Sequence, residues 1–557
     1  MRMSREANHW PLAAAIVFDN VEMKLGRCAG RGSSQSSAII SLAIPLLMLG
    51  ISTPSPVQLQ QSSESVRRVQ SLIQQGDTAS ARAVLSGLLK QSPQDATLSN
   101  LDGVLKAQTQ DFAGAEASFQ KAIELAPRSD DAYLNLGHLY QQQSASQPAA
   151  RDKAIDVYER LLKLEPDNVE SLYQSAFLLM EKGLYSLSLQ HLSKLPSASQ
   201  GRPQALSVLC GDYVGSGENQ KAEAVAGRMK QSPGLKEADV VSLLPLLERH
   251  KASSIEIELL AALQRRSLAT SNSLTSLGLL YKDQGRLTEA RSTLDAAAQL
   301  PPDSAPLLLD LAQVADAQKD YTGALGYLAH ARELEPRNAA IHFFWGMVCV
   351  KLNLAEEAYQ ALKKAVSMDA NNAYYNYALG AVILQRDDAG EAIQYFQKYC
   401  DLKPHDPRGR LALGSAYFIS HDDERAEKIL ATVANDPETT AGAHYYLGRI
   451  ANHQGDYQQA IEQLHLALKA YPDYADAYAE MGLVHLKQKD YRTSRADLQK
   501  ALEINADNYT ANLNLMVLYQ RTQDPKGDEQ AKRFEKLSKE RAQRVKDFLR
   551  TIQVRPE

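Results

Sequence analysis

The chain has 557 residues, of which 44% are hydrophobic and only 7% aromatic, and its formal net charge at pH 7 is −5. This acidic balance gives no reason to expect nucleic acid as a partner, because surfaces that bind nucleic acid are strongly basic. The four cysteines are scattered singly with no CxxC spacing, so neither a zinc site nor a disulfide framework is indicated.

Residues 1–61 are an N-terminal extension in which an apolar segment, residues 38–52, follows a basic stretch that begins near Met23. A basic lead before an apolar run is typical of a secretory signal. Its fifteen residues are too short for a bilayer core of about 30 Å, and Pro45 would kink a helix. We therefore expect cleavage and export, to the periplasm or outside the cell. The open alternative is an uncleaved segment that tethers the protein to the membrane.

Residues 62–236 read as an irregular array of helical units. Its third unit, residues 130–168, is 39 residues long and carries the extra residues in a polar loop between its two helices. Insertions are tolerated at such turns because they disturb no packing surface, although the loop is also a place for partner contact. A divergent helical unit, residues 237–270, joins this array to a regular one.

Residues 271–508 repeat one pattern every 34 residues through seven units without an insertion or a deletion. The recurring alanines are Ala290, Ala324, Ala358, Ala392, Ala426 and Ala460. Twelve residues ahead of most of them is a glycine, at Gly278, Gly346, Gly380, Gly414 and Gly448, with Gly482 continuing the series and Ala312 in the one gap. A fixed period of this kind indicates a stacked solenoid.

The unit of residues 441–474 shows what one repeat is physically. Apolar and small residues at three- and four-residue spacing predict two helices, separated at Gly455 and Asp456. The two helices form an antiparallel hairpin. We expect Gly448 and Ala460 to be small because the helices approach closely there, and a larger side chain would push the hairpin open.

Residues 509–557 predict a terminal hairpin whose second helix caps the array. The cap has one apolar stripe, and the rest of its surface is mostly charged, as expected for a helix with one face on the last repeat and one in water. The stripe consists of Phe534, Leu537, Val545, Phe548, Leu549 and Ile552.

The repeating positions resemble the tetratricopeptide repeat, which carries a Leu-Gly pair, Tyr, Ala and Pro at fixed offsets. One unit matches through Tyr133, Leu136, Gly137, Tyr140, Ala154, Tyr158 and Pro166, and another through Leu277, Gly278, Tyr281, Ala290, Leu294, Ala297 and Pro302. The resemblance covers nearly everything after Gln60. It implies an all-α fold, a right-handed superhelical solenoid of antiparallel helix hairpins.

No motif in the sequence points to catalysis. The phosphate-binding glycine loops, HExxH, GxSxG and the calcium loop are all absent from the chain. His421, Asp422 and Asp423 are adjacent, but they lie at a predicted turn, where exposed polar residues are expected. We predict a protein that is not an enzyme and that has no catalytic, cofactor-binding or metal-binding residues.

The resemblance implies that the first helix of each unit lines a concave groove that binds a partner protein or peptide. The predicted contact residues are Phe343, Met347, Val350, Tyr374, Tyr377, Leu411, Phe418, Ile419 and Tyr445. Apolar anchors along a groove provide affinity for an extended peptide or a helix. Two alternatives stay open: these side chains pack on adjacent units, or the protein is a passive structural or assembly platform in a cell-envelope complex, held by its ends and convex face. The family's clamp for a terminal carboxylate is not matched, because Leu134 and His138 replace its lysine and asparagine.

Overall fold

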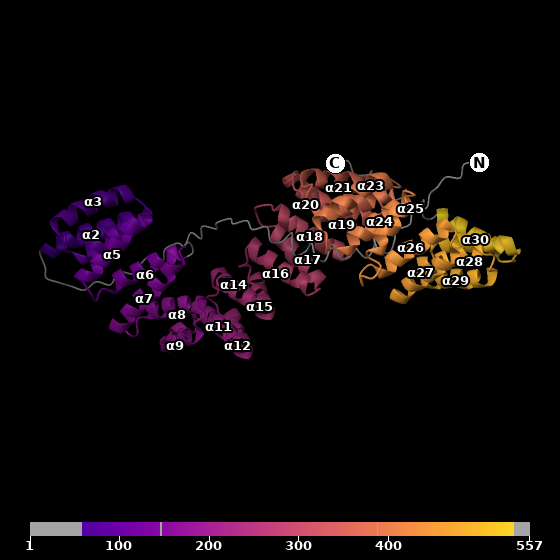
Figure 1. The fold of residues 1–557 in the computed structure, drawn as a ribbon. Helices are drawn as coiled ribbons and strands as arrows, with labels where there is room; N and C mark the ends of the chain where they lie inside the picture. The colour runs from indigo at the N-terminus through magenta and orange to yellow at the C-terminus, as the bar shows by residue number, and fades with distance from the viewer. Residues whose placement is uncertain (1–57, 145–146, 387, 540–557) are drawn as a thin grey trace. The chain divides into compact units, whose positions relative to one another are not determined.

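The computed structural model describes residues 58–144, 147–386 and 388–539. Within these ranges 29 helices, α2 to α30, are described over their full length, and no strand occurs (Figure 1). The predicted all-α architecture of consecutive helix hairpins is therefore confirmed. The signal-like segment at residues 38–52 lies outside the described residues, as do Val545, Phe548, Leu549 and Ile552 of the predicted cap.

The helices fall into two compact units, one ending at Pro301 and the other continuing from Pro302. The first unit contains α2 (Gln58–Gln74), α3 (Thr78–Gln91), α4 (Ala96–Gln108), α5 (Phe112–Leu125), α6 (Asp130–Gln143), α7 (Pro148–Leu164), α8 (Val169–Glu181), α9 (Tyr185–Lys194), α10 (Ser197–Gln200), α11 (Pro203–Gly215), α12 (Asn219–Gln231), α13 (Glu237–Val241), α14 (Leu244–Arg249), α15 (Ser253–Arg265), α16 (Ser271–Asp283) and α17 (Leu287–Ala298).

The second unit contains α18 (Ala305–Ala317), α19 (Tyr321–Leu334), α20 (Ala339–Lys351), α21 (Ala355–Met368), α22 (Ala373–Gln385), α23 (Ala389–Leu402), α24 (Pro407–Ile419), α25 (Asp423–Ala431), α26 (Thr440–Gln454), α27 (Tyr457–Ala470), α28 (Ala475–Lys487), α29 (Tyr491–Ile504) and α30 (Tyr509–Thr522). Another helical stretch begins at residue 527 and reaches the end of the described residues at 539.

Many hairpins close where a glycine of the first helix meets a large side chain of the second. A methyl group added at Gly448 would lie 2.8 Å from Cγ of Leu464, and one at Gly482 would lie 2.6 Å from Cγ of Leu498. The same contact recurs for Gly278, Gly346 and Gly414 with leucines, and for Gly103 and Gly380 with phenylalanines. The close approach predicted from the periodic glycines is therefore confirmed.

Acidic and amide side chains fix the starts of many helices. Asp456 accepts a hydrogen bond from the backbone N–H of Gln459 at the start of α27, and Asp490 does the same for Thr493 at the start of α29. Asn338 and Asn372 cap the first helices α20 and α22 in the same way. Such caps satisfy backbone donors that have no partner inside the helix, which is why these residues recur with the repeat.

The divergent unit, residues 237–270, departs from the hairpin pattern in its first half. Two short helices, α13 and α14, replace one first helix, and Pro245 lies in the first turn of α14. Proline fits the start of a helix because it lacks a backbone N–H, but it interrupts a continuing one. The carboxylate of Glu237 accepts hydrogen bonds from Thr270 and Ser273, which ties this unit to α16.

Candidate binding surface

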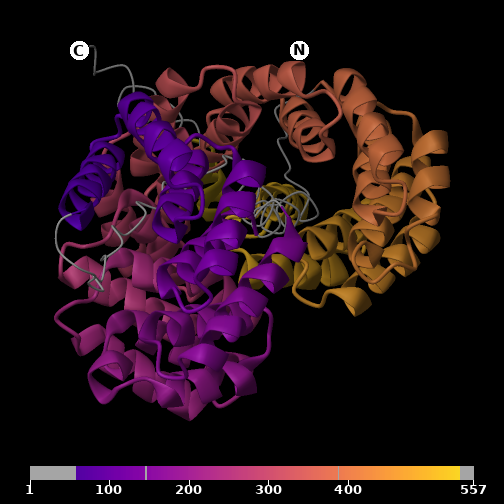
Figure 2. The same cartoon turned by 90° about the vertical axis from the view of Figure 1, so that its left-hand side faces the viewer.

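The first helices of the hairpins from α20 onward, α20, α22, α24, α26, α28 and α30, are neighbours in space. We call the surface that they form the first-helix face. Figure 2 shows these hairpins as a curved row that runs from orange to yellow. Because the units are 34 residues long, residues at that spacing occupy equivalent places on successive helices.

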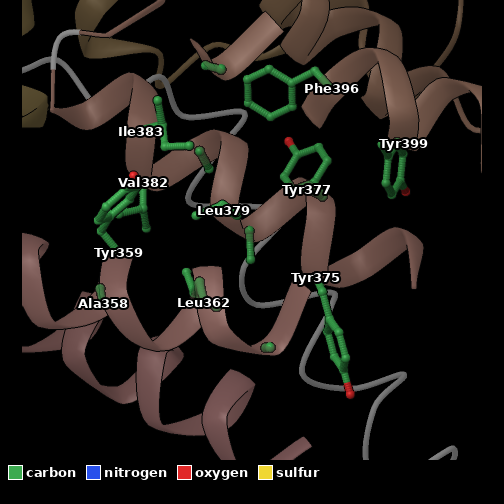
Figure 3. Packing of buried hydrophobic residues seen from close by; sticks show 14 of the residues in the cluster. Ala358, Tyr359, Leu362, Tyr375, Tyr377, Leu379, Val382, Ile383, Phe396 and Tyr399 are labelled. Carbon is green, nitrogen blue, oxygen red and sulfur yellow. The ribbon is translucent and has the colours of Figure 1, made fainter. Parts of the chain in front are cut away.

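Five of the predicted contact residues are buried in the packing between hairpins. Their exposed fractions are 2% for Phe343, 1% for Met347, 4% for Tyr377, 4% for Leu411 and 6% for Tyr445. The ring of Tyr377 packs edge-on against Phe396 and Tyr399, with centroids 5.5 and 5.0 Å away (Figure 3). These residues stabilise the stacking of the hairpins, and their role in binding stays a prediction.

The other four predicted residues, Val350, Tyr374, Phe418 and Ile419, are half-buried. Val350 and Phe418 occupy the same position on α20 and α24, and half-buried Leu384 occupies it on α22. We call Val350, Leu384 and Phe418 the apolar row. Neighbouring helices pack about 8 to 10 Å apart, so the row presents one apolar side chain at each such step. These side chains keep accessible surface after the hairpins have stacked.

Arg449 on α26 continues the first-helix face beyond the apolar row, and sequence reasoning missed it. Its guanidinium carbon lies 4.7 Å from the ring centre of Phe418, 5.5 Å from that of Tyr445 and 5.8 Å from that of Tyr446. Cations over aromatic faces are attracted by the ring quadrupole. Burial lowers the pKa of Arg449, but Tyr445 and Glu480 beside it raise the pKa above its usual value overall, so the guanidinium stays charged.

A chain of side chains links Arg449 to α28. Nε of Arg449 lies 3.8 Å from a carboxylate oxygen of Glu480, which is an ion-pair distance without a hydrogen bond. The side chain of Asn452 donates to Glu480 and accepts from Nζ of Lys487 at 2.7 Å. Lys351 and Asp316 occupy the same repeat positions as Lys487 and Asn452, and they form an ion pair in which Nζ of Lys351 lies 2.8 Å from the carboxylate of Asp316. Polar or charged residues at these positions therefore connect successive first helices.

Tyr474 lies at the N-terminus of α28 and packs on Tyr445 with ring centres 5.0 Å apart. The side chain is 1% exposed. Its hydroxyl has no hydrogen-bond partner among the described residues. Burial raises the pKa of Tyr474 well above its ordinary value, so the hydroxyl is a neutral donor. A buried hydroxyl without a partner is unfavourable by about 1 to 3 kcal/mol, so such groups are uncommon in native proteins.

The histidines and acidic residues at the turn before α25 were also considered as a possible site. His421 has a positive φ of 63° in the turn before α25, and His453 bonds Asp423 at 2.6 Å. Within the described ranges, no group of three or more His, Cys, Asp or Glu side chains is arranged to hold a metal ion. No helix in that part of the chain combines the length and the apolar character needed to cross a bilayer.

Comparison with protein families gives one consistent description. A tetratricopeptide repeat model matches residues 66–130, 275–339, 411–475 and 447–509, and a second model of the same description matches residues 315–382. Among curated proteins, the chain is 23% identical over 317 residues to BBSome complex member BBS4 of Bos taurus, covering 57% of this chain and 53% of the relative. It is 24% identical over 390 residues to tetratricopeptide repeat protein 37 of Xenopus laevis, covering 64% of this chain and 24% of that one. The chain thus spans about half of the first relative and a quarter of the second.

Solved structures that are similar include a tetratricopeptide repeat protein from Parabacteroides merdae, with a TM-score of 0.40 and 18% identity over 44% of this chain and 98% of that one. The Cut9–Hcn1 hetero-tetramer of the APC/C is similar with a TM-score of 0.38 and 15% identity, over 83% of this chain and 98% of that one.

Proposed function

Since this chain belongs to the tetratricopeptide repeat family, we propose that it is a non-enzymatic scaffold that binds a partner protein or peptide on its first-helix face. The observation that carries the proposal is the apolar row of Val350, Leu384 and Phe418, which stays partly exposed on three successive helices. Contiguous apolar surface that is left exposed on a folded protein favours a binding role. A rigid array would also lower the ordering cost of association.

The charged residues beside the row support the same proposal. Arg449 and Lys487 follow the row toward the C-terminal end, whereas the Asp316–Lys351 pair precedes it. Apolar anchors at the centre of an interface supply most of the affinity, and polar groups around them set register and specificity. The first-helix face offers both kinds of group in a fixed order along the repeat.

A substitution in the apolar row tests the proposal without removing buried stacking residues such as Tyr377. We would compare the wild type with a Val350→Ala, Leu384→Ala, Phe418→Ala variant after crosslinking in the native cell and quantitative mass spectrometry of purified complexes. The matched control is Leu334→Ala, Leu466→Ala, Tyr471→Ala, which removes apolar residues that are 39%, 41% and 38% exposed and belong to or follow second helices. Circular dichroism would verify that all three proteins keep the same helicity.

Loss of a partner from the row variant alone, by tenfold or more, is the expected result. If the control variant alone loses its partners, the protein is instead an assembly platform that uses its ends and convex face, and the first-helix face is packing surface. Recovery of the same partners from all three proteins counts against the proposed face as well.

We also propose that the protein acts after export, either released into the periplasm or outside the cell or tethered through residues 38–52. The support is the sequence pattern of a basic lead and a short apolar run. Mass spectrometry of the N-terminus of the native protein tests this. A mature N-terminus within the linker after residue 52 indicates cleavage, an intact segment in the membrane fraction indicates a tether, and an intact segment in the soluble cytosol contradicts export.

A further inference from the structure

Asp212 is a fully buried carboxyl group at the contact between α9 and α11. It lies on α11, is 0% exposed, and its Oδ1 has no hydrogen-bond partner among the described residues. Its Oδ2 lies 2.6 Å from Oγ of Ser188 on α9. Asp212 therefore meets the hairpin α8–α9 through one polar contact, at the place where that hairpin stacks on α11.

This contact has one proton too few if Asp212 is ionised. Oγ of Ser188 also lies 2.9 Å from the backbone oxygen of Ala176, in the first helix of its own hairpin. A hydroxyl has one proton to donate, whereas a carbonyl and a carboxylate can only accept. An ionised Asp212 would leave one of the two close pairs of oxygen atoms without a proton between them.

A serine at the equivalent place in another hairpin shows where the proton of Ser188 goes. Ser494 on α29 donates to the carbonyl of Gly482 at 2.7 Å, twelve residues earlier. Ser188 follows Ala176 by the same twelve residues, so we expect its hydroxyl to donate to Ala176. The proton between Ser188 and Asp212 then belongs to Asp212, which donates it to Oγ of Ser188 as a neutral acid.

A second contact between a serine and an aspartate in the same unit is built differently. Oγ of Ser118 on α5 lies 2.6 Å from Oδ2 of Asp102 on α4, and Nζ of Lys106 lies 2.6 Å from the same oxygen. The ammonium group supplies both a donor and a positive charge, so the Asp102 carboxylate is paired while it is ionised. Among the described residues, Asp212 has no cation at ion-pair distance.

None of the other titratable groups around α11 acts on the Asp212 carboxyl, whose pKa is raised to about 8 by burial and lowered only by the bond to Ser188. On α8 and α9 these groups are Glu170, Tyr173, Glu181, Tyr185, His191 and Lys194. On α13, Glu237 bonds Thr270 and Asp239 bonds the backbone of Lys236. The charged side chains of α12 and α14 are exposed, except Lys230, which pairs with Glu258. His191 also titrates near neutral pH, but burial lowers its pKa, so it favours opening at low pH, which is the opposite direction.

We propose that Ser188 and neutral Asp212 form a proton-dependent lock that holds the hairpin α8–α9 on α11 and weakens as the pH rises. Once Asp212 has lost its proton, a buried charge without a cation lies against Oγ of Ser188. Separation of α9 from α11 relieves this, because water then reaches the carboxylate. The lock makes the rigidity of the first unit depend on pH, and it does not depend on the binding role proposed for the first-helix face.

The range over which the lock responds follows from the two states of Asp212. In an opened state its pKa returns to an ordinary value of about 4. Below about pH 4 both states hold the proton, and between about pH 4 and pH 8 only the closed state does. Each pH unit in this range therefore favours opening about tenfold, and the effect levels off above about pH 8.

Hydrogen exchange of the full-length protein from about pH 5 to pH 9 tests the lock, with rates corrected for the intrinsic pH dependence of exchange. We expect the opening constant in peptides from α9 and α11 to rise about tenfold per pH unit up to about pH 8. Asp212→Asn keeps a neutral side chain that can donate to Ser188, so its opening constant should not change with pH. Peptides from α2 to α5 should show no such slope in either protein.

Two matched serine variants test whether the hydroxyl holds the hairpin. Ser188→Ala places at this position the alanine that recurs there in the regular array, and it removes the one partner of Asp212. It should raise opening of α9 and α11 about tenfold already at about pH 5, where Asp212 is neutral. Ser494→Ala removes the same atoms at the equivalent place without an aspartate, so it should leave α9 and α11 unchanged.

The inference is overturned if exchange of α9 and α11 in the wild type has no slope with pH, a result that needs no variant. It is equally overturned if Asp212→Asn keeps the wild-type slope, or if α2 to α5 share that slope, because the whole unit would then open together. Equal opening of the wild type and Ser188→Ala at about pH 5 would show that the hydroxyl does not hold the hairpin, and would also sink the lock.

Discussion

At Gly448 a single added methyl group tests the packing of a hairpin directly. In Gly448→Ala the new Cβ would lie 2.8 Å from Cγ and 3.1 Å from Cδ2 of Leu464, and 3.2 Å from the backbone oxygen of Ala460. Contacts this short force the helices apart or shift Leu464, which costs about 1 to 3 kcal/mol. Alanine has a higher helix propensity than glycine, which stabilises the helix by about 1 kcal/mol and offsets part of this cost. Because Ala312 occupies the equivalent place in another hairpin, we expect a net loss of about 1 kcal/mol.

Gly326 in α19 supplies the matched control. A Cβ there meets nothing within 4 Å, so Gly326→Ala gains helix propensity without a steric cost. It should stabilise its hairpin by about 0.5 to 1 kcal/mol. The two substitutions are chemically identical and both lie within helices, so the difference between them isolates the close approach at Gly448.

Hydrogen exchange with mass spectrometry is the appropriate assay, because repeat arrays open locally. The unfolding midpoint of the whole protein would respond only weakly to a change of stability in one hairpin. Protection in peptides from α26 and α27 should fall about fivefold in Gly448→Ala, while protection in α18 and α19 should rise in Gly326→Ala. In a Leu464→Ala background the contacts with Leu464 disappear and only the 3.2 Å contact with the backbone oxygen of Ala460 remains, so Gly448→Ala should cost less than it does in the wild type. Unchanged or increased protection in the single Gly448→Ala variant would refute the argument that this glycine is required by the approach of the helices.

Three further predictions concern buried polar groups. Burial raises the pKa of Asp212 to about 8, so between about pH 4 and pH 8 the folded state keeps a proton that the unfolded state has lost, and stability falls as pH rises. The free energy of unfolding of Asp212→Asn and of the wild type would be measured by chemical denaturation from pH 5 to 9. The variant should become more stable than the wild type by about 1.4 kcal/mol for each pH unit, up to about pH 8. A difference that does not change with pH would contradict the raised pKa. Tyr474→Phe should raise the thermal midpoint, because it removes a buried hydroxyl without a partner, and a lower midpoint would mean that the hydroxyl is satisfied. Lys351→Met should reduce the local stability of α18 and α20 by about 3 kcal/mol, because it removes the ion-pair partner of the Asp316 carboxylate. Adding Asp316→Asn to the same chain should restore most of that stability. Hydrogen exchange of α18 and α20 would measure both changes.

The hairpins could be predicted from the sequence because their closest contact is local and periodic. Gly448 contacts Leu464, which follows it by sixteen residues. A small residue followed at this fixed offset by a large one is therefore a pattern that the sequence shows. The offset is 21 for Gly137 and Tyr158, where the polar loop inserts five residues, and the contact persists. The two short helices α13 and α14 were not predicted, because apolar spacing continues through Pro245 and only the backbone reveals the interruption.

The site on the first-helix face could be predicted only in part, because burial there depends on how neighbouring hairpins stack. Position alone placed Tyr377 and Phe418 on the same helix face, but Tyr377 is enclosed by Phe396 and Tyr399, whereas Phe418 keeps accessible surface. Arg449 left no signal in the sequence. The residues around Arg449 come from three helices, α24, α26 and α28, which are distant in the sequence. From the sequence alone, a single arginine in a repeat is therefore expected to be a solvated surface residue.

A binding surface has to be reachable before its partner arrives, and this requirement separates two sets of residues on the same helices. The buried set, which includes Phe343, Tyr377 and Tyr445, fixes how each hairpin stacks on the next, so substitutions there change the array itself. The half-buried set, the apolar row with Arg449 at its end, packs on the edge of the core and also keeps accessible surface. Stacking by the first set therefore holds the second set in fixed register, and the spacing of the repeat becomes the spacing that a bound segment must match.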